Sequence, residues 1–173
     1  HRHVTSLLHR IKTSENGVIC KPVLSFDERG HQKNNMIYYV AGSTENGENP
    51  VSFFPTVASF IGESGTFLAP EALAKNQKGC GAGKEFAGEE ALGAMTFAEI
   101  MLAPGQAQEY IVVSGMTESE EEITRTAEAF HTKEQADAAF IKAKEYWNGL
   151  VNISFETGNP KEDSYLKWIC FQP

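Results

Sequence analysis

The chain has 173 residues and a mass of 19.0 kDa, which is enough for one domain with a sizeable core or two very small ones. Hydrophobic residues make up 41% and charged residues 22%, an ordinary globular composition that excludes wholesale disorder. The formal net charge of −8 argues against nucleic-acid binding, because phosphate contacts need a surplus of lysine and arginine. The sequence has no run of about 18 apolar residues, so no membrane span is predicted.

The charge is distributed unevenly along the chain. Residues 1–40 hold six basic and three acidic side chains, whereas residues 41–131 hold four basic and fourteen acidic ones. An acidic middle section of this kind is typical of a solvated surface. It disfavours anionic partners.

Cysteine usage favours a reducing compartment. Cys20, Cys80 and Cys170 are widely spaced and form no CxxC pair. An odd count without a recognisable secretory segment indicates reduced thiols in a cytoplasmic protein, although a disulfide between two of the three stays open.

The first two thirds of the sequence is predicted to be β-structure. Apolar or aromatic runs predict strands over residues 4–12, 18–26 and 36–41, and a turn that contains glycine follows each run, with asparagine beside it in the first and third. Residues 51–60 predict a further strand, which Pro55 would confine to a sheet edge or break.

A hairpin is predicted later in the chain. Apolar residues alternate from Ala94 to Leu102, Pro104-Gly105 supplies a turn, and residues 110–113 form the return strand. The connection over residues 62–88 is long and rich in glycine and alanine, with a short helical turn near residues 70–74.

From about Ser119 the apolar period changes from two to about 3.6, which predicts helices. One short helix ends near Phe130, and Thr132 with Gln135 forms a capping box for a second. The second helix has one apolar stripe. A last strand is predicted after it, over residues 152–156. Asn159-Pro160 then begins a third helix.

The two ends of the sequence lead us to expect a piece of a longer protein. The chain opens with His1-Arg2-His3 rather than methionine, and the third helix ends in apolar residues that have nothing in the sequence to pack against. We therefore expect Trp168, Ile169 and Phe171 to lie on a neighbouring chain or to be poorly ordered, because their native cover is absent.

Three segments resemble catalytic motifs without matching them. Residues 79–84 lack the glycine and hydroxyl positions of a phosphate loop, so a flexible loop is favoured. Residues 62–65 lack the spacing of a nucleophile elbow. Residues 27–31 gather four ionisable side chains, which are typical of a solvated turn rather than an acid/base pair. No catalytic residue is predicted.

Metal and sugar binding have only weak signals. His1 and His3 could chelate copper or nickel at a cut N-terminus, but no zinc, iron or calcium motif is present, and no metal site is predicted. Aromatic side chains could stack on sugar rings, although one of each consecutive pair should face the core. These are Tyr38, Tyr39, Phe53 and Phe54.

The order of several short motifs resembles glycoside hydrolase family 94, the inverting disaccharide and β-glucan phosphorylases. The motifs are Phe60 to Leu73, Gly81-Ala82-Gly83, Leu102 to Gly105, Val113 to Gly115, Glu118 to Phe130, Tyr146-Trp147, and Tyr165 to Gln172. The resemblance covers residues 18–173. Within it, the segment from Leu24 to His31 is more similar to the larger oligoglucan phosphorylases than to cellobiose phosphorylase.

The resemblance implies a mainly β fold, an antiparallel supersandwich followed by linker helices. It assigns residues 1–116 to the sandwich, 117–157 to linker helices and a last strand, and 158–173 to the first helix of an (α/α)6 catalytic barrel. The family's catalytic aspartate and phosphate site lie in that barrel, and no position here matches them.

The resemblance leads to one functional hypothesis and one alternative. The first is a non-catalytic portion of a glycoside phosphorylase that uses inorganic phosphate as co-substrate and no other cofactor. Its expected partners are the barrel, a second subunit and a β-glucan oligosaccharide, with unknown binding residues. The alternative is a stand-alone carbohydrate-binding or adhesion sandwich. A reading frame that continues into a helical domain would favour the first.

Overall fold

The computed structural model describes residues 6–150 and 153–171, apart from the side chains of residues 26 and 27. It divides into two compact units, residues 1–135 and 136–173. The strands are β1 (Arg10–Thr13), β2 (Gly17–Lys21), β3 (Leu24–Asp27), β4 (Gly30–Lys33), β5 (Ile37–Thr44), β6 (Ser52–Thr56), β7 (Glu85–Ala87), β8 (Ala91–Thr96) and β9 (Tyr110–Thr117). The helices are α2 (Val57–Ile61), α3 (Glu71–Ala74), α4 (Glu120–Ala129), α5 (Lys133–Leu150) and α6 (Pro160–Ile169).

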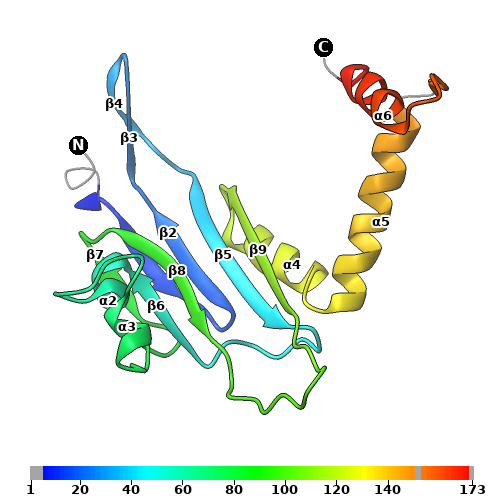
Figure 1. The fold of residues 1–173 in the computed structure, drawn as a ribbon. Helices are drawn as coiled ribbons and strands as arrows, with labels where there is room; N and C mark the ends of the chain where they lie inside the picture. The colour runs from blue at the N-terminus through cyan, green and yellow to red at the C-terminus, as the bar shows by residue number, and fades with distance from the viewer. Residues whose placement is uncertain (1–5, 151–152, 172–173) are drawn as a thin grey trace. The chain divides into compact units, whose positions relative to one another are not determined.

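The first unit is built on a five-stranded sheet in the order β7-β1-β2-β5-β9, in which each neighbouring pair is antiparallel (Figure 1). Two smaller sheets accompany it, β6 with β8 and the hairpin β3–β4. β1 and β2 form a tight hairpin, and its turn is closed by a hydrogen bond from Ser14 N to Gly17 O of 2.8 Å. This is the asparagine-glycine turn expected from the sequence.

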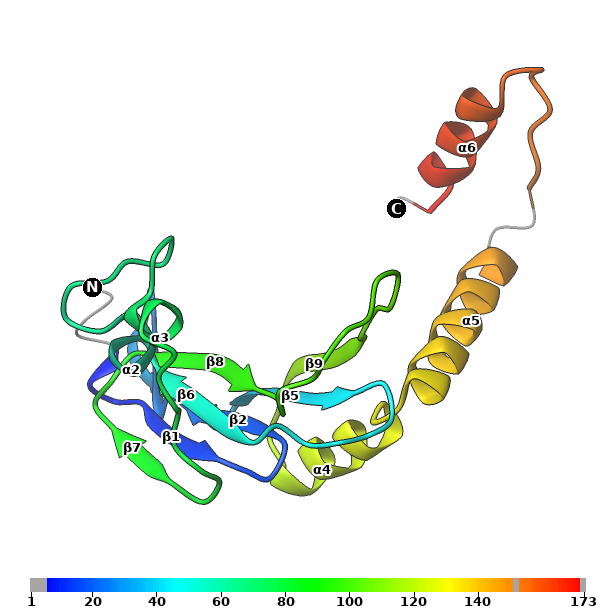
Figure 2. The same ribbon diagram turned by 60° about the horizontal axis from the view of Figure 1, so that its bottom comes forward.

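The two faces of the large sheet have different cover. On the inner face, Ile11 and Val18 pack with Phe53 of β6 in one buried cluster. On the outer face, Ile19 and Ile37 pack against Ile123 of α4 in a second cluster. The β6–β8 sheet and α4 therefore lie on opposite faces (Figure 2). The predicted mainly β fold with C-terminal helices is confirmed.

The strand predicted over residues 18–26 is two strands. Pro22 has no N–H to donate to the sheet, and Leu24 N instead bonds Pro22 O at 2.7 Å. Val23 at this turn has φ of 67°, a conformation that β-branched residues rarely adopt. The chain thus leaves the large sheet after Lys21 and forms the separate β3–β4 hairpin. Similarly, the strand predicted from residue 4 begins only at Arg10, and residues 4 and 5 lie outside the described part.

The predicted hairpin between residues 94 and 113 is wrong. β8 pairs with β6, and β9 pairs along its whole length with β5, from Tyr110 opposite Thr44 to Thr117 opposite Ile37. Residues 97–109 form a loop instead of the end of a strand. Its first residue, Phe97, places its ring 4.6 Å from the ring of Tyr110, centroid to centroid. The start of the alternating run belongs to β8, which pairs with β6, whereas Ile100, Met101 and Leu102 are exposed in the loop.

The effect of Pro55 was predicted correctly. β6 lies in a two-stranded sheet, its pairing with β8 shifts between Phe54 and Thr56, and α2 begins at Val57. Thr56 caps α2, because its hydroxyl accepts a hydrogen bond from Ser59 N at 3.1 Å.

The predicted helix starts are confirmed. The Thr132 hydroxyl accepts from Gln135 N at 3.3 Å, while Thr132 N donates to the Gln135 side chain at 2.9 Å. The Asn159 side chain accepts from Lys161 N at 3.1 Å at the start of α6. Residues 153–156 form no strand, so the last predicted strand is wrong in its described part, and residue 152 lies outside that part.

The second unit exposes most of its apolar side chains. The stripe expected on α5 includes Phe140 and Trp147, which are 72% and 54% exposed. On α6, Trp168 is 54% and Ile169 43% exposed, and Phe171 touches Trp147 with a ring separation of 5.9 Å. Trp168 and Ile169 are thus not fully buried within their own chain, whereas Phe171 is partly buried.

Candidate functional site

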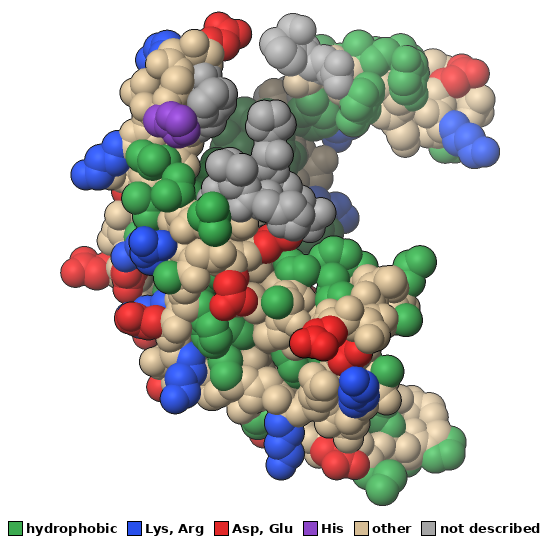
Figure 3. All heavy atoms as spheres, turned by 90° about the vertical axis from the view of Figure 1, so that its left-hand side faces the viewer, with side chains coloured by type: hydrophobic (Ala, Val, Ile, Leu, Met, Phe, Trp, Pro, Cys, Tyr) green, Lys and Arg blue, Asp and Glu red, His purple; other side chains and the backbone are tan. Residues whose placement is uncertain are grey.

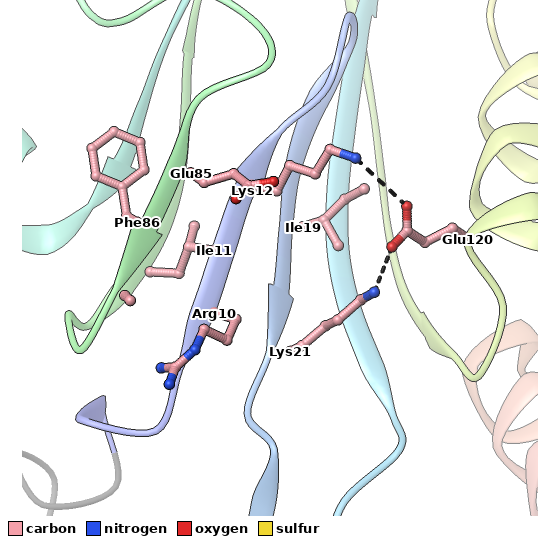
Figure 4. Close-up of a pocket in the computed structure, with 9 residues that line it drawn as sticks. Arg10, Ile11, Lys12, Ile19, Lys21, Glu85, Phe86 and Glu120 are labelled. Carbon is pink, nitrogen blue, oxygen red and sulfur yellow. Dashed lines mark hydrogen bonds and ion pairs between the residues drawn. The ribbon is translucent and has the colours of Figure 1, made fainter.

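A cavity of about 420 Å³, lined by both charged and apolar side chains, opens on the outer face of the large sheet, beside the start of α4. We call it the β1–β2 trough. Its walls come from β1, β2, β7 and the first residue of α4 (Figure 4). The residues that line it are Arg10, Ile11, Lys12, Ile19, Lys21, Glu85, Phe86, Ala87 and Glu120.

Strand alternation explains why cations gather in the trough. Arg10 and Lys12 are two residues apart on β1, so both point to the outer face, and Lys21 stands opposite Arg10 on β2. Ile11 and Thr13 point to the inner face and are buried. The first 40 residues hold the chain's basic surplus, and part of that surplus lies here.

Glu120 connects the trough to α4. Its carboxylate receives a hydrogen bond from Lys21 Nζ at 2.5 Å, and Lys12 Nζ lies 3.9 Å away. The hydrogen bond from Lys21 lowers the pKa of the Glu120 carboxyl, with smaller contributions from the two ammonium charges against an opposing effect of burial. Glu120 is therefore ionised at neutral pH.

The end of β9 sets the position of this glutamate. The Thr117 hydroxyl donates to the Glu122 carboxylate and accepts from Ser119 N at 3.1 Å, which fixes the bend between β9 and α4. Three glutamates then occupy the first turn of α4, where negative charge is favoured by the helix dipole.

The trough offers hydrogen-bond donors and acceptors beside an apolar surface. Two carboxylates and three cations surround the buried side chain of Ile19. Such a lining can bind a hydroxyl-rich ligand, but its ionised Glu120 cannot act as a proton donor. On the face that Figure 3 shows, acidic and basic side chains are similarly interspersed.

Of the four aromatic candidates, only one is strongly exposed. Tyr38 is 45% exposed, while Tyr39 packs against the Ile19 cluster. Phe53 and Phe54 are both buried, so the expectation that one of each pair faces away from the core is wrong for them. The reason is that α2 covers the second face of β6, where the Phe60 ring meets the Phe54 ring edge-on at 5.8 Å.

The glycine-rich loop over residues 79–84 is held by hydrogen bonds rather than freely flexible. The buried Thr13 hydroxyl donates to Gly81 O and accepts from Lys84 N, both at 2.9 Å. Cys80 exchanges two backbone hydrogen bonds of 2.8 Å with Phe53. The loop is thus a structural element that joins β1 to β6.

The other motif-like segments also have structural roles. In residues 62–65, Ser64 N donates to Glu71 at 3.1 Å, and Lys75 binds the same carboxylate at 2.7 Å. Residues 27–31 form the end of β3, the turn of the β3–β4 hairpin and the start of β4. His1 and His3 lie outside the described residues, and His9 Nδ1 is a buried atom without a hydrogen-bond partner in the described chain.

The three thiols form no disulfide, and no metal cluster is found among the described residues. Cys20, Cys80 and Cys170 are free, and burial raises the pKa of the Cys20 and Cys80 thiols. Among the described residues, no group of three or more His, Cys, Asp or Glu side chains could hold a metal ion. No described helix is long and apolar enough to cross a membrane.

A comparison with protein families gives a decisive match. The sequence model described as "Glycosyl hydrolase 94, supersandwich domain" matches residues 4–133, which is most of the chain and nearly all of its first unit. The chain belongs to glycosyl hydrolase family 94. It is thus part of a family of carbohydrate-active enzymes, as the order of its motifs indicated. No curated protein matches the chain.

Within this supersandwich domain, sequence reasoning missed the β1–β2 trough. The alternation of Arg10 and Lys12 was a usable signal, because it places two cations on one face of a strand. Glu120, the acidic residue that completes the trough, lies 99 residues from Lys21 in the sequence. No local sequence pattern indicates that the two side chains meet.

Proposed function

We propose that the chain is a non-catalytic sandwich and linker portion of a glycoside phosphorylase, a glycosyltransferase that cleaves β-linked glucans with inorganic phosphate and inversion. The observation that carries this proposal is the supersandwich match over residues 4–133. In the whole enzyme, a barrel aspartate would protonate the glycosidic oxygen while phosphate attacks the anomeric carbon. The present portion would support the barrel, and phosphate would be the co-substrate.

The chemistry of the trough supports a non-catalytic role. A general acid for glycosidic cleavage needs a carboxyl group that keeps its proton near neutral pH. The pKa of Glu120 is shifted the opposite way by Lys21. Because Lys21 and Lys12 both approach Glu120, they are poorly placed to bind a phosphate dianion instead.

The test is an assay of the protein encoded by the full reading frame that contains this sequence. It is incubated with β-1,2-, β-1,3- and β-1,4-linked glucose oligomers, with and without inorganic phosphate. We expect α-glucose 1-phosphate from one linkage class only when phosphate is present, because inversion of a β-linkage yields the α-anomer. Release of free glucose without phosphate would identify a hydrolase and contradict the proposal.

A further inference from the structure

A second cavity of about 420 Å³ lies at the start of β6, and we call it the β6 groove. Phe53 of β6 pairs with Met95 of β8 on one side and with Cys80 on the other. The first residues of β6 therefore lie between the end of β8 and the segment that follows α3. The groove shares no lining residue with the β1–β2 trough, and its volume is typical of small-molecule sites.

Backbone hydrogen bonds hold both sides of the groove in place. On one side, Gln77 N donates to Ala72 O at 2.9 Å, and Asn76 has a φ of 44°, a left-handed conformation that asparagine tolerates. On the other side, Val51 N donates to Thr96 O at 2.7 Å. A ligand thus meets a lining that is already ordered, which reduces the entropic cost of binding.

Two hydroxyl groups of the groove lack partners within the described chain. Ser52 is only 9% exposed, and its hydroxyl has no hydrogen-bond partner among the described residues. Thr96 stands opposite Ser52 on β8, so the two side chains share one face, and the Thr96 hydroxyl is unpartnered within the same described part. Because buried polar groups are almost always hydrogen-bonded, a partner for Ser52 has to reach it from the groove.

Four further polar side chains supply donors and acceptors in balance. The carboxamides of Asn76 and Gln77 each donate and accept. Lys78 can only donate and Glu99 can only accept, and their charges cancel. None of the four side chains has a hydrogen bond or an ion pair with another described residue. A lining of this kind matches hydroxyl groups, which also donate and accept, and it selects neither anions nor cations.

Gly81 lines the groove without a structural reason to be glycine. Its φ is not positive, and a Cβ there would meet nothing within 4 Å, so neither backbone conformation nor packing requires glycine. Gly79 differs, because a Cβ there would lie 2.3 Å from Phe53 O. A glycine that its own fold does not require is expected where another molecule approaches the backbone closely.

We propose that the β6 groove is a non-catalytic binding site for a neutral saccharide. Sugar hydroxyls pair with the unpartnered polar groups, and the apolar face of a sugar ring lies on Val51, which is 60% exposed. The surrounding section, residues 41–131, holds fourteen acidic and four basic side chains and so disfavours an anionic ligand. The proposal concerns binding alone and holds whether the whole enzyme is a phosphorylase or a hydrolase.

The first test follows the amide resonances of the 173-residue chain by NMR while β-1,2-, β-1,3- or β-1,4-linked glucose trimers are added to about 20 mM. We expect at least one trimer to shift the amides of Gln77, Gly79 and Gly81. The expected dissociation constant is on the order of 1 mM, because no aromatic ring is among the described residues that line the groove. Phosphate is left out, so the result is separate from any phosphorolysis.

Substitutions decide whether binding takes place in the groove. Gln77→Ala and Ser52→Ala each remove one hydrogen-bonding group and should raise the dissociation constant about three- to tenfold. Gly81→Phe places a ring on the wall of the groove and should raise it at least about tenfold. Gln32→Ala removes the same carboxamide from β4, away from the groove, and is the matched control that should leave affinity unchanged.

Far-UV circular dichroism checks that each variant is folded, and the two alanine variants decide if Gly81→Phe is not. Three outcomes overturn the proposal. The first is no shift of the groove amides with any trimer at about 20 mM. The second is a set of shifts confined to residues of the β1–β2 trough. The third is a loss of affinity in Gln32→Ala as large as that in Gln77→Ala.

Discussion

Lys21 on β2 and Glu120 at the start of α4 lie 99 residues apart in sequence and 2.5 Å apart in space, from Nζ to Oε1. This pair ties the helix that covers the outer face to the strand beneath it. Both side chains are nearly half exposed, so solvent screens the interaction and its contribution to stability is modest.

Glu120→Gln should lower the free energy of unfolding at pH 7 by about 0.5 kcal/mol, the usual size for an exposed ion pair. Because Lys21 holds the pKa of Glu120 below its ordinary value of 4.5, the contribution is present above that value and is lost as pH falls through the folded pKa. Urea unfolding of both proteins at pH 7 and pH 3 (roughly the acid limit of the transition) measures this. The control is Glu121→Gln in the same helical turn, and an equal loss in the control would contradict the assignment.

Thr13→Val should destabilise the chain by about 1–3 kcal/mol, because it removes the hydroxyl that bonds Gly81 O and Lys84 N in a buried place. Thr13→Ser keeps that hydroxyl and should cost less. Urea unfolding, together with hydrogen exchange at the Lys84 amide, compares the two. A valine variant as stable as the original would show that the loop is not held by Thr13.

Two glycines of the loop over residues 79–84 should respond differently to alanine. A Cβ at Gly79 would lie 2.3 Å from Phe53 O, a backbone atom that cannot move away cheaply. A Cβ at Gly81 would meet nothing within 4 Å. Thermal unfolding should show Gly79→Ala destabilised by about 1–3 kcal/mol and Gly81→Ala nearly unchanged. Equal effects at the two positions would be inconsistent with the described packing.

The three thiols should react at different rates with an aromatic disulfide reagent at pH 8 (about the pH at which an ordinary thiol begins to ionise). Cys170 is exposed, whereas burial raises the pKa of Cys20 and lowers its thiolate fraction. We expect one fast thiol, whose phase disappears in Cys170→Ser, and slower reaction at Cys20 and Cys80. All three should react quickly in denaturant. A fast phase that survives Cys170→Ser would contradict this order.

Local features of the fold were predictable from sequence because their causes are local. Examples are the helix caps at Thr132 and Asn159 and the turn before Gly17. Each depends only on residues a few positions away in the sequence. The partner of β9 was not predictable, since apolar alternation shows which side of a strand is covered and not which strand lies beside it. The burial of Phe54 was not predictable either, since it depends on α2 folding back to cover β6.

The site was predictable only in part for the same reason. Alternating cations on β1 indicate a charged face, but the trough exists because α4 brings Glu120 to it from a distant segment. The family, by contrast, followed from the order of many short motifs along the whole chain. Each motif alone is weak, and only the segment from Glu118 to Phe130 reaches the trough, through Glu120.

A single glucose 1-phosphate assay that compares the 173-residue chain with the protein encoded by the full reading frame tests the proposed function most directly. Both are supplied with β-linked glucose oligomers and phosphate, and both are tested in the synthetic direction. We expect turnover by the longer protein and none by the chain alone, because we propose that the acid and the phosphate site belong to the barrel. Turnover by the chain alone at a comparable rate would contradict it.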